Sequence, residues 1–336
     1  MRLPWGKLAT VGEAFLSKQS YGIIGCLSPE YRCVSVPMRI ACGPGTCQFI
    51  RLLEIHDPDD AFPNYSTEAK AKRDENRIAL DAAGVRYDST RADLLDADGK
   101  QLKQLAWCLT DHVPETVVLD ITAFPKRYFA LYLKKLMLRS EIQNLIITYS
   151  VPSPGGYSDG HLASDPLPCD HLPGFAAPPP DSGSCLLASM GFEPLNLKGI
   201  LSMHRAGGVT VKIVLPFPPD GIGIRRAFNS LRNLASHEAA EIGCNTVYVV
   251  STWDAEYLYR QMGVWQQGYQ KMYLLPFGPK PHTLGMVLYA IKHNCGIYYT
   301  QPKSYSPNYS QGAGDSWVYV VKWEGIPCYE RYQSGT

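Results

Sequence analysis

The residues best suited to chemistry stand where an apolar run gives way to a helical pattern. The loop Phe277-Gly278-Pro279-Lys280-Pro281-His282-Thr283 follows such a run. Gly278 would let the backbone approach a ligand, the helix start offers N–H donors, and Lys280 adds a charge suited to phosphate. The loop does not match the P-loop pattern G-x-x-x-x-G-K-[ST], so ATP hydrolysis of that type is not expected. The alternative is a proline-stiffened turn with a solvated lysine.

A second candidate is Asp120, which closes a β-branched run two residues before Thr122. At the end of a strand its carboxylate could bind a ribose hydroxyl, a metal or a catalytic water. Equally, it could accept nearby backbone N–H groups, with Thr122 as the cap of the next helix. Asp120 is therefore the one candidate for a catalytic residue, and the sequence leaves the local alternative open.

Tyrosines gather in the C-terminal part of the chain, where 13 of the 21 lie at or beyond position 248. The string 298–310 is both aromatic and polar, and we take Thr300, Tyr305 and Tyr309 from it as candidate ligand contacts. A tyrosine combines an apolar face with a hydroxyl, which suits a base or a sugar and also a protein interface. The alternative is a packed loop that covers the edge of a sheet.

Other patterns point away from common enzyme classes. Leu187-Ala188-Ser189-Met190-Gly191 lacks the first glycine of the serine-hydrolase elbow, and Ser189 falls within a strand-like run. No G-x-G-x-x-G follows a strand, so an ordinary dinucleotide dehydrogenase is not expected. The turn at residues 56–60, HDPDD, could attract a hard cation, but a solvated turn is favoured because no second group of ligands is nearby in the sequence.

Composition limits the remaining choices. The chain has 336 residues, 45% of them hydrophobic, and a net charge of +1, which argues against extensive nucleic-acid binding. No apolar run is long enough to cross a membrane, and the N-terminus has no signal-peptide core, so a cytoplasmic protein is predicted. The ten cysteines form no C-x-x-C pair and are expected to be reduced. We predict no metal site, and the cofactor is unknown.

The elements that must position these residues begin with strands predicted at 21–28, 32–41 and 48–56. Helices are predicted at 66–84 and 101–112. The run 115–122, the amphipathic stretch 123–140 and the run 144–150 then form a strand–helix–strand unit. Such a unit is typical of a parallel sheet with a right-handed crossover.

A stretch rich in proline and glycine, 151–184, interrupts this alternation of strands and helices and is either a lid or a linker. Tyr157, Leu162, Leu172 and Phe175 favour a packed loop. Alternation then resumes, with strands expected at 185–192, 209–217, 245–252, 271–277, 296–302 and 316–323, and helices at 223–240, 254–262 and through 286–293. We therefore predict an α/β, Rossmann-like fold with a mainly parallel sheet. It would be built from two halves, 1–150 and 185–336, joined by the loop 151–184.

Several strings resemble motifs of uncharacterised bacterial Rossmann-like proteins: LDITAFPKRYF, IITYSVPSPGGY, LPGF, GFEP, LLPFGPKP and YYTQPKSYSPNYSQG, together spanning about 115–312. The resemblance implies an association with anti-phage defence loci and with CRISPR-associated Rossmann-fold sensors. The chain departs from those sensors because it lacks a recognisable C-terminal effector segment. The resemblance therefore implies a component that works with a protein partner.

Ligands of open α/β sheets gather outside the carboxyl ends of the strands. We therefore expect a nucleotide-like or phosphorylated ligand at this edge, bound by Asp120, Thr122, Gly278, Lys280, Thr300, Tyr305 and Tyr309. Two alternatives stay open. One is a metal- or water-dependent phosphodiesterase or nucleosidase, and the other is a non-catalytic interaction subunit.

Overall fold

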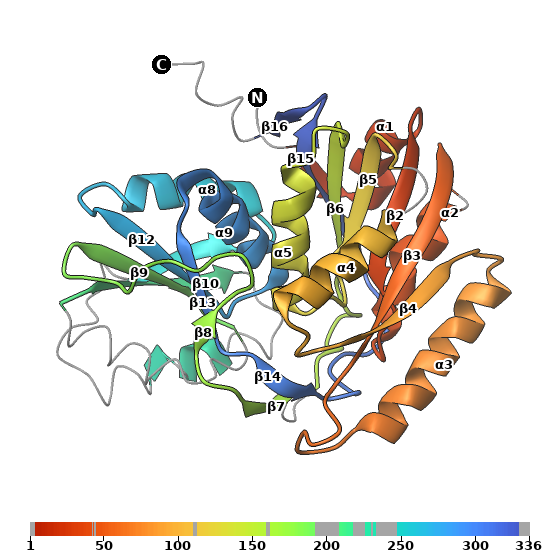
Figure 1. The fold of residues 1–336 in the computed structure, drawn as a ribbon, viewed down its shortest axis with the longest axis horizontal. Coiled ribbons are helices and arrows are strands. Elements are labelled where there is room, and N and C mark those ends of the chain that lie inside the picture. Colours follow the sequence, from red (N-terminus) through yellow and green to blue (C-terminus); the bar gives the residue numbers. More distant parts are fainter. Residues whose placement is uncertain are drawn as a thin grey trace. The chain divides into compact units, whose positions relative to one another are not determined.

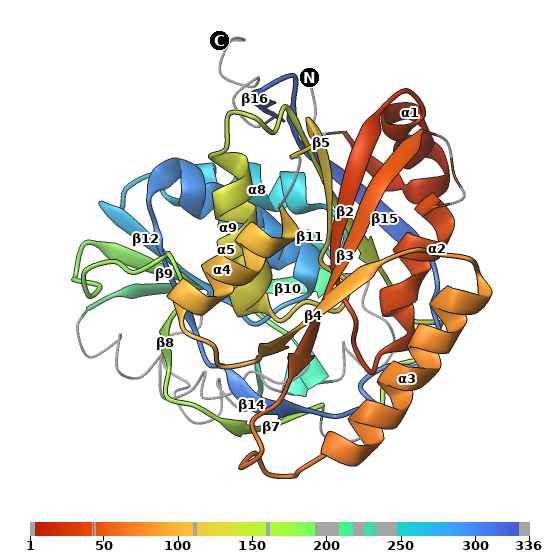
Figure 2. The ribbon, with the colours of Figure 1, turned by 45° about the vertical axis from the view of Figure 1, so that its right-hand side comes forward.

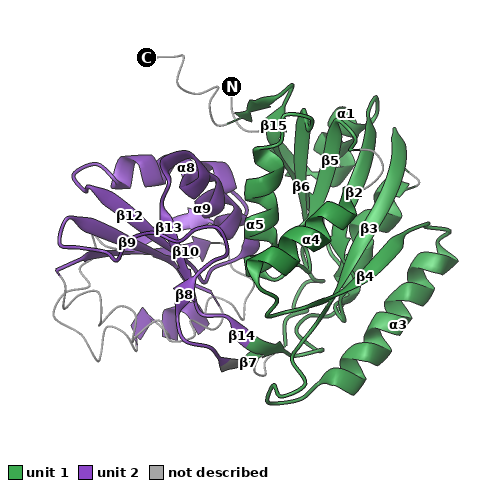
Figure 3. Cartoon of the chain, in the orientation of Figure 1, with its two compact units in different colours: residues 1–164, 303–336 green, residues 165–302 purple. Residues whose placement is uncertain are grey.

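The computed structural model describes residues 4–41, 43, 45–109, 113–158, 162–191, 208–217, 226–229, 231–232 and 247–328. The chain divides into two compact units (Figure 3). Unit 1 holds residues 1–164 and 303–336, and unit 2 holds residues 165–302. These bounds differ from the expected halves, because the last long strand returns to the first sheet instead of extending the second. Each unit is described by itself below.

The sheet of unit 1 contains five parallel strands, in the spatial order β4-β3-β2-β5-β6, with β4 at one edge. They are β2 (Ser20–Cys26), β3 (Thr46–His56), β4 (Asp88–Asp93), β5 (Thr116–Asp120) and β6 (Asn144–Ser150). Strand β15 (Ser316–Trp323) runs antiparallel to β6 and is followed at the sheet edge by β1 (Trp5–Lys7), while β16 (Ile326–Pro327) also pairs with β15. The first strand of the parallel set, β2, therefore lies in the middle.

Helices cover both faces of this sheet (Figures 1 and 2). On one face lie α4 (Asp98–Cys108) and α5 (Lys126–Met137), and on the other lie α2 (Ser35–Ala41) and α3 (Ser66–Ala82). The short η1 (Leu8–Gly12), α1 (Glu13–Leu16) and η2 (Tyr31–Val34) complete the helices described in unit 1. Because helices flank both faces, β5 and β6 are buried along their whole length, as their continuous apolar runs predict.

The predicted strand at 32–41 is wrong: this segment forms η2 and α2. Among its buried residues, Cys33, Val36, Pro37 and Ile40 have the i, i+3, i+4, i+7 spacing of a helix, and Arg32, Val34 and Ser35 are buried as well. Pro37 lies in the first turn of α2, where its missing N–H costs no intrahelical hydrogen bond. The proline therefore marks a helix start, not a sheet edge.

The sheet of unit 2 repeats the same parallel arrangement, in the order β11-β10-β9-β12-β13. Its strands are β9 (Ser184–Ser189), β10 (Thr210–Phe217), β11 (Val247–Ser251), β12 (Lys271–Pro276) and β13 (Gly296–Tyr299), with β8 (Asp170–His171) antiparallel to β13. Helices α8 (Ala255–Trp265) and α9 (Lys280–His293) pack together. The helix expected at 223–240 lies largely outside the described residues.

The predicted α/β, Rossmann-like, mainly parallel fold is confirmed. In each unit, the first strand is central, the next two lie to one side and the last two to the other, which is the 3-2-1-4-5 order of doubly wound sheets. The described residues of the stretch 151–184 form a packed segment, since Leu162, Leu172 and Phe175 are each at most 2% exposed. It contains β7 (Ala163–Pro166), which pairs with β14 (Pro302–Tyr305). Among the described residues, no helix is both long and apolar enough to cross a membrane.

Candidate functional site

The strand order of unit 1 reverses between β2 and β5, and the carboxyl ends of these two neighbours form the topological switch point. Successive connections leave this point towards opposite faces of the sheet, which is where doubly wound proteins bind ligands. The β2 end leads into Ser28, Glu30 and Arg32, and the β5 end carries Asp120 and Thr122. Two of the predicted ligand contacts therefore lie at the switch point.

Asp120 is buried and joins the ends of β5 and β6. Its Oδ1 accepts hydrogen bonds from the backbone N–H of Thr122 and from the hydroxyl of Thr148, both at 3.2 Å, and from the Thr122 hydroxyl. The Thr122 hydroxyl in turn accepts the backbone N–H of Ser150 at 2.9 Å. This geometry matches the local alternative drawn from the sequence, in which Asp120 receives nearby donors. A direct contact of Asp120 or Thr122 with a ligand stays a prediction.

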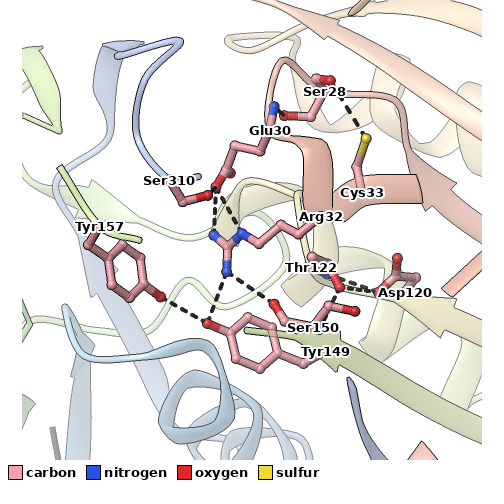
Figure 4. Close-up of polar contacts among 10 residues, drawn as sticks. All are labelled: Ser28, Glu30, Arg32, Cys33, Asp120, Thr122, Tyr149, Ser150, Tyr157 and Ser310. Atoms are coloured by element: carbon pink, nitrogen blue, oxygen red, sulfur yellow. Dashed lines mark hydrogen bonds and ion pairs between the residues drawn. The ribbon is translucent and has the colours of Figure 1, made fainter. Parts of the chain in front are cut away.

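Arg32 is the buried cation of the switch point (Figure 4). Its Nε and Nη2 donate to Oε2 of Glu30 at 2.9 and 2.7 Å, and its Nη1 donates to the Tyr149 hydroxyl and the Ser150 carbonyl oxygen, both at 3.2 Å. Burial by itself lowers the pKa of Arg32, but Glu30 and nearby tyrosines outweigh it and raise that pKa above its ordinary value. Arg32 therefore stays protonated, and its contacts with Glu30, Tyr149 and Ser150 hold the β2 and β6 ends together.

The tyrosine-rich segment 303–310 lies across the same edge of unit 1. The Ser310 hydroxyl donates to Glu30 at 2.6 Å, and the ring of Tyr309 packs edge-on against Tyr157, whose hydroxyl lies 3.3 Å from that of Tyr149. A continuous set of contacts thus runs from Ser310 through Glu30 and Arg32 to Ser150 and the Thr122 hydroxyl (Figure 4). Four predicted site residues are brought to one edge: Asp120, Thr122, Tyr305 and Tyr309.

Polar contacts also tie this segment to the β3 side of the edge. The backbone N–H of Tyr305 donates to Asp57 at 3.1 Å, and Lys303 pairs with Asp60 at 3.5 Å. Further along, Lys72 of α3 donates to the Pro307 carbonyl oxygen at 3.1 Å. The segment 303–310 is therefore held over the ends of β2 and β3 largely by polar groups, and we call it the tyrosine strap.

The turn after β3 is not the fully solvated turn that its sequence favours. Asp59 and Asp60 are exposed, but His56 and Asp57 are partly buried. Burial raises the pKa of Asp57 to about 6, although the Tyr305 N–H and Arg73 oppose the shift. Burial, reinforced by Arg73 and Arg91, lowers the pKa of His56 to about 4. Groups with perturbed pKa values cluster at functional sites. We therefore include this turn, which contacts Tyr305 through Asp57, in the candidate site.

Two arginines of unit 1 each have a buried Nε. Nη1 of Arg73, from α3, lies 3.3 Å from both ring nitrogens of His56, and its Nε is buried with no hydrogen-bond partner among the described residues. Nη2 of Arg127, in the first turn of α5, donates to the Asp96 carbonyl oxygen at 3.0 Å, and its Nε is likewise buried without a described partner. Burial is the main cause that lowers the pKa of both.

The other predicted site residues belong to unit 2, where Gly278 follows β12 at the second switch point. A Cβ at Gly278 would lie 1.9 Å from Oγ of Ser189 and 3.0 Å from the Met190 carbonyl oxygen. The backbone of Gly278 thus closely approaches the end of β9, the neighbouring strand. This close approach within the protein gives a structural reason for the glycine that the sequence does not reveal.

Ser189 is part of a buried polar contact at that point. Its hydroxyl lies 2.9 Å from Nδ1 of His282, and Nε2 of His282 lies 2.9 Å from the Ser251 carbonyl oxygen. Ser189 and His282 are both fully buried. Because a carbonyl oxygen only accepts, Nε2 donates to Ser251, and in the neutral imidazole Nδ1 accepts from Ser189. The pair therefore connects β9, β11 and α9 inside unit 2.

Lys280 and Thr300 flank this arrangement. Lys280 is the first residue of α9 and is partly exposed, as a ligand contact at a helix start requires. Thr300 is fully buried beyond β13, and its hydroxyl lies against the Cys169 thiol, whose pKa burial raises to about 11. Ligand contacts through Gly278, Lys280 and Thr300 stay predictions. In the part of the chain that the structure describes, no three His, Cys, Asp or Glu side chains gather as metal ligands would.

Sequence reasoning missed Arg32, Arg73 and Arg127. Arg32 was hidden in a segment interpreted as a strand, and its partners Tyr149 and Ser150 are 117 and 118 residues away. Arg73 stands on the buried side of α3, where a charged residue among the apolar positions Ala69 and Leu80 was the available signal. Arg127 directly precedes an apolar run, which gives no indication that its Nε is buried.

Comparisons with known proteins give a distant likeness of fold only. No family model and no curated protein matches the chain. The cytoplasmic domain of a prokaryotic cation chloride cotransporter is 8% identical with a TM-score of 0.21, over 85% of this chain and 96% of that one. A protein assigned as a universal stress protein from Pseudomonas aeruginosa UCBPP-PA14 is 10% identical with a TM-score of 0.25, over 85% and 94%. A UDP-N-acetylglucosamine 2-epimerase is 10% identical with a TM-score of 0.25, over 77% and 74%.

Proposed function

We propose that this protein binds a nucleotide-like or otherwise phosphorylated ligand at the carboxyl edge of the unit 1 sheet. The observation that carries the proposal is the convergence of the tyrosine strap with Asp120 and Thr122 at the switch point. These residues come from three separate parts of the sequence and are connected through Glu30 and Arg32. Rings of Tyr305 and Tyr309 would face a base or a sugar.

The polar groups at the switch point argue for binding by a prearranged edge. Asp120 is held by the hydroxyls of Thr122 and Thr148, and Arg32 is held by Glu30 and Tyr149. Groups that are locked in this way lose little freedom when a ligand arrives. The hydrogen bonds from Thr122 and Thr148 also occupy Oδ1 of Asp120. This favours a binding role over the phosphodiesterase or nucleosidase alternative, in which the Asp120 carboxylate would act on a metal or a water.

The proposal includes a role within a multi-protein system, in which the ligand-bound protein acts through a partner. This part rests on the resemblance to defence-associated bacterial Rossmann-like proteins. A non-catalytic interaction subunit is the alternative. It would show no response to any nucleotide.

The direct test is thermal stability of the full chain against mono- and dinucleotides, NAD, ADP-ribose and cyclic oligonucleotides. A ligand at about 100 times its Kd stabilises the native state by about 2.7 kcal/mol, which gives a readable shift. We expect at least one member to raise Tm, and Tyr305→Ala to reduce the effect. Tyr257→Ala, an exposed tyrosine of unit 2, is the matched control and should respond like the wild type. No shift with any member would overturn the proposal.

A further inference from the structure

The outer strands of the two described sheets differ in how their free edges are protected. An outer strand leaves a row of backbone N–H and C=O groups unpaired. Proteins usually prevent another strand from adding there by keeping the outer strand short or charged. In the sheet of unit 1, β1 has three residues, and β4 carries Asp88, Arg91 and Asp93. In the sheet of unit 2, β8 has two residues. These three strands are therefore protected.

The other outer strand of unit 2, β11, has neither form of protection. Its five residues, Val247–Ser251, include no charged side chain. It pairs with β10 in register along its whole length and is the last strand of the sheet as described. Its middle residue, Val249, is 61% exposed. An uncharged outer strand of this length is the kind of edge to which a further strand adds.

The free hydrogen-bonding groups of β11 lie at its middle residue. Just beyond the strand, the N–H of Thr252 donates to the Phe217 carbonyl oxygen of β10 at 3.0 Å. Successive residues of a strand direct their backbone groups to alternate sides. The N–H groups of Val250 and Tyr248 therefore point towards β10 as well, and those of Val249 point away from it. Val249 thus presents one donor and one acceptor to an added strand.

The side chains at this edge are apolar as well. In the register of the two strands, Phe217 of β10 lies opposite Ser251, so Phe217 and Val249 are on the same face of the sheet. Phe217 is 53% exposed. Exposed apolar side chains that adjoin a free strand edge mark a surface for protein association more than a solvated edge.

We propose that β11 pairs antiparallel with β11 of a second copy of this chain, so that the protein forms a two-fold dimer through unit 2. This inference is independent of the proposed function. A two-fold axis at Val249 places this residue opposite its own copy, and each N–H then meets the carbonyl oxygen of the other. Tyr248 lies opposite Val250 of the second copy, and such an aromatic and β-branched combination stabilises antiparallel pairs.

Charge explains why the pairing uses β11 and not the longer free edge of unit 1. Within the β11 pair no charges oppose each other, because the strand has none. The same two-fold pairing of β4 would set Asp88 against Asp93 of the second copy. Like charges that lie directly opposite each other destabilise a strand pair.

The test is sedimentation velocity of the full chain over about a hundredfold range of concentration. The wild type should sediment as a dimer. Val249→Lys and Val249→Glu should each weaken association by about tenfold or more, because each sets two like charges against each other at the two-fold axis. An equimolar mixture of the two variants should recover the dimer, since lysine then faces glutamate. Asp88→Lys changes the free edge of β4 and should leave the dimer unchanged.

Three results would overturn the proposal. One is a wild type that stays monomeric at the highest concentration. Another is a dimer that survives both Val249 variants, because the contact would then lie on a different surface. The third is a pair of variants that dissociate but do not associate when mixed, which would show that the two copies of Val249 do not face each other. Circular dichroism confirms first that each variant folds, as expected for an exposed position.

Discussion

The Arg32 side chain connects the loop after β2, the end of β6 and, through Glu30, the tyrosine strap. It lies between Glu30 from its own loop and Tyr149 and Ser150 at the end of β6. Glu30 also receives the Ser310 hydroxyl of the tyrosine strap. Both charges of the pair are largely hidden from water, with side chains 3% and 14% exposed. Breaking a buried pair is much more costly than breaking an exposed one, because the remaining charge is left unpaired.

Glu30→Gln is accordingly expected to lower the free energy of unfolding by about 3–5 kcal/mol. The double variant Glu30→Gln/Arg32→Met should recover part of this loss, since it removes the stranded cation. Urea unfolding gives both values. Glu141→Gln breaks the exposed pair with Arg139 and should cost about 1 kcal/mol or less. Equal losses in the free energy of unfolding for Glu30→Gln and Glu141→Gln would show that the buried pair stabilises the protein no more than the exposed pair.

His56 and Asp57 make opposite contributions to the pH dependence of stability. The pKa of Asp57 rises to about 6 on folding, so the folded state keeps a proton that the unfolded state has lost, and stability falls as pH rises from about 4 to 6. The pKa of His56 falls to about 4, so the unfolded state holds the extra proton, and stability rises with pH from about 4 to 6.5. In the wild type the two trends largely offset each other.

Asp57→Asn should remove the contribution of Asp57 and leave that of His56 to dominate the pH dependence of stability. We expect the stability of this variant to rise more steeply with pH than that of the wild type between about 4 and 6.5. Urea midpoints across this range measure the difference. Asp59→Asn changes an exposed residue of the same turn and should follow the wild-type profile. Parallel profiles for Asp57→Asn and the wild type would mean that Asp57 titrates normally in the folded state.

At the scale of elements, the sheet of unit 2 depends on how closely its central strands meet. In unit 2 the end of β12 touches the end of β9, and Gly278 and Gly191 have no room for a Cβ there. The Ser189–His282 contact then connects the end of β9 to α9. The start of α9, where Lys280 is predicted to meet a ligand, is therefore fixed by packing at the switch point.

Gly278→Ala should consequently destabilise the protein by about 1–3 kcal/mol, because the added methyl would overlap the Ser189 hydroxyl. Gly99→Ala, near the start of α4, is the matched control. Nothing lies within 4 Å of a Cβ there, so this change should be neutral or slightly stabilising. Thermal unfolding of the two variants decides the point, and a Gly278→Ala protein as stable as the wild type would contradict the close packing.

At the scale of the whole molecule, local patterns predicted the parallel strands but not the contacts that join them. Continuous β-branched runs revealed β5 and β6, because strands buried on both faces carry no polar alternation. The segment 32–41 was misinterpreted, since its apolar residues suit either period and Pro37 was taken as a strand edge. Asp120 and Tyr305 were found from their positions at element ends. The contact of Arg73 with His56 could not be predicted, because it depends on how α3 packs against the end of β3 in the folded protein.

The most direct test of a ligand edge in unit 1 is hydrogen exchange of the full chain with and without the nucleotide that raises its Tm most. Binding should slow exchange in the tyrosine strap, 303–310, and in the segments that follow β3 and β5, because these surround the proposed site. Exchange in 278–283 of unit 2 should be unchanged. Protection confined to 278–283, with the strap and the β3 and β5 ends unaffected, would place the ligand in unit 2 and contradict this account.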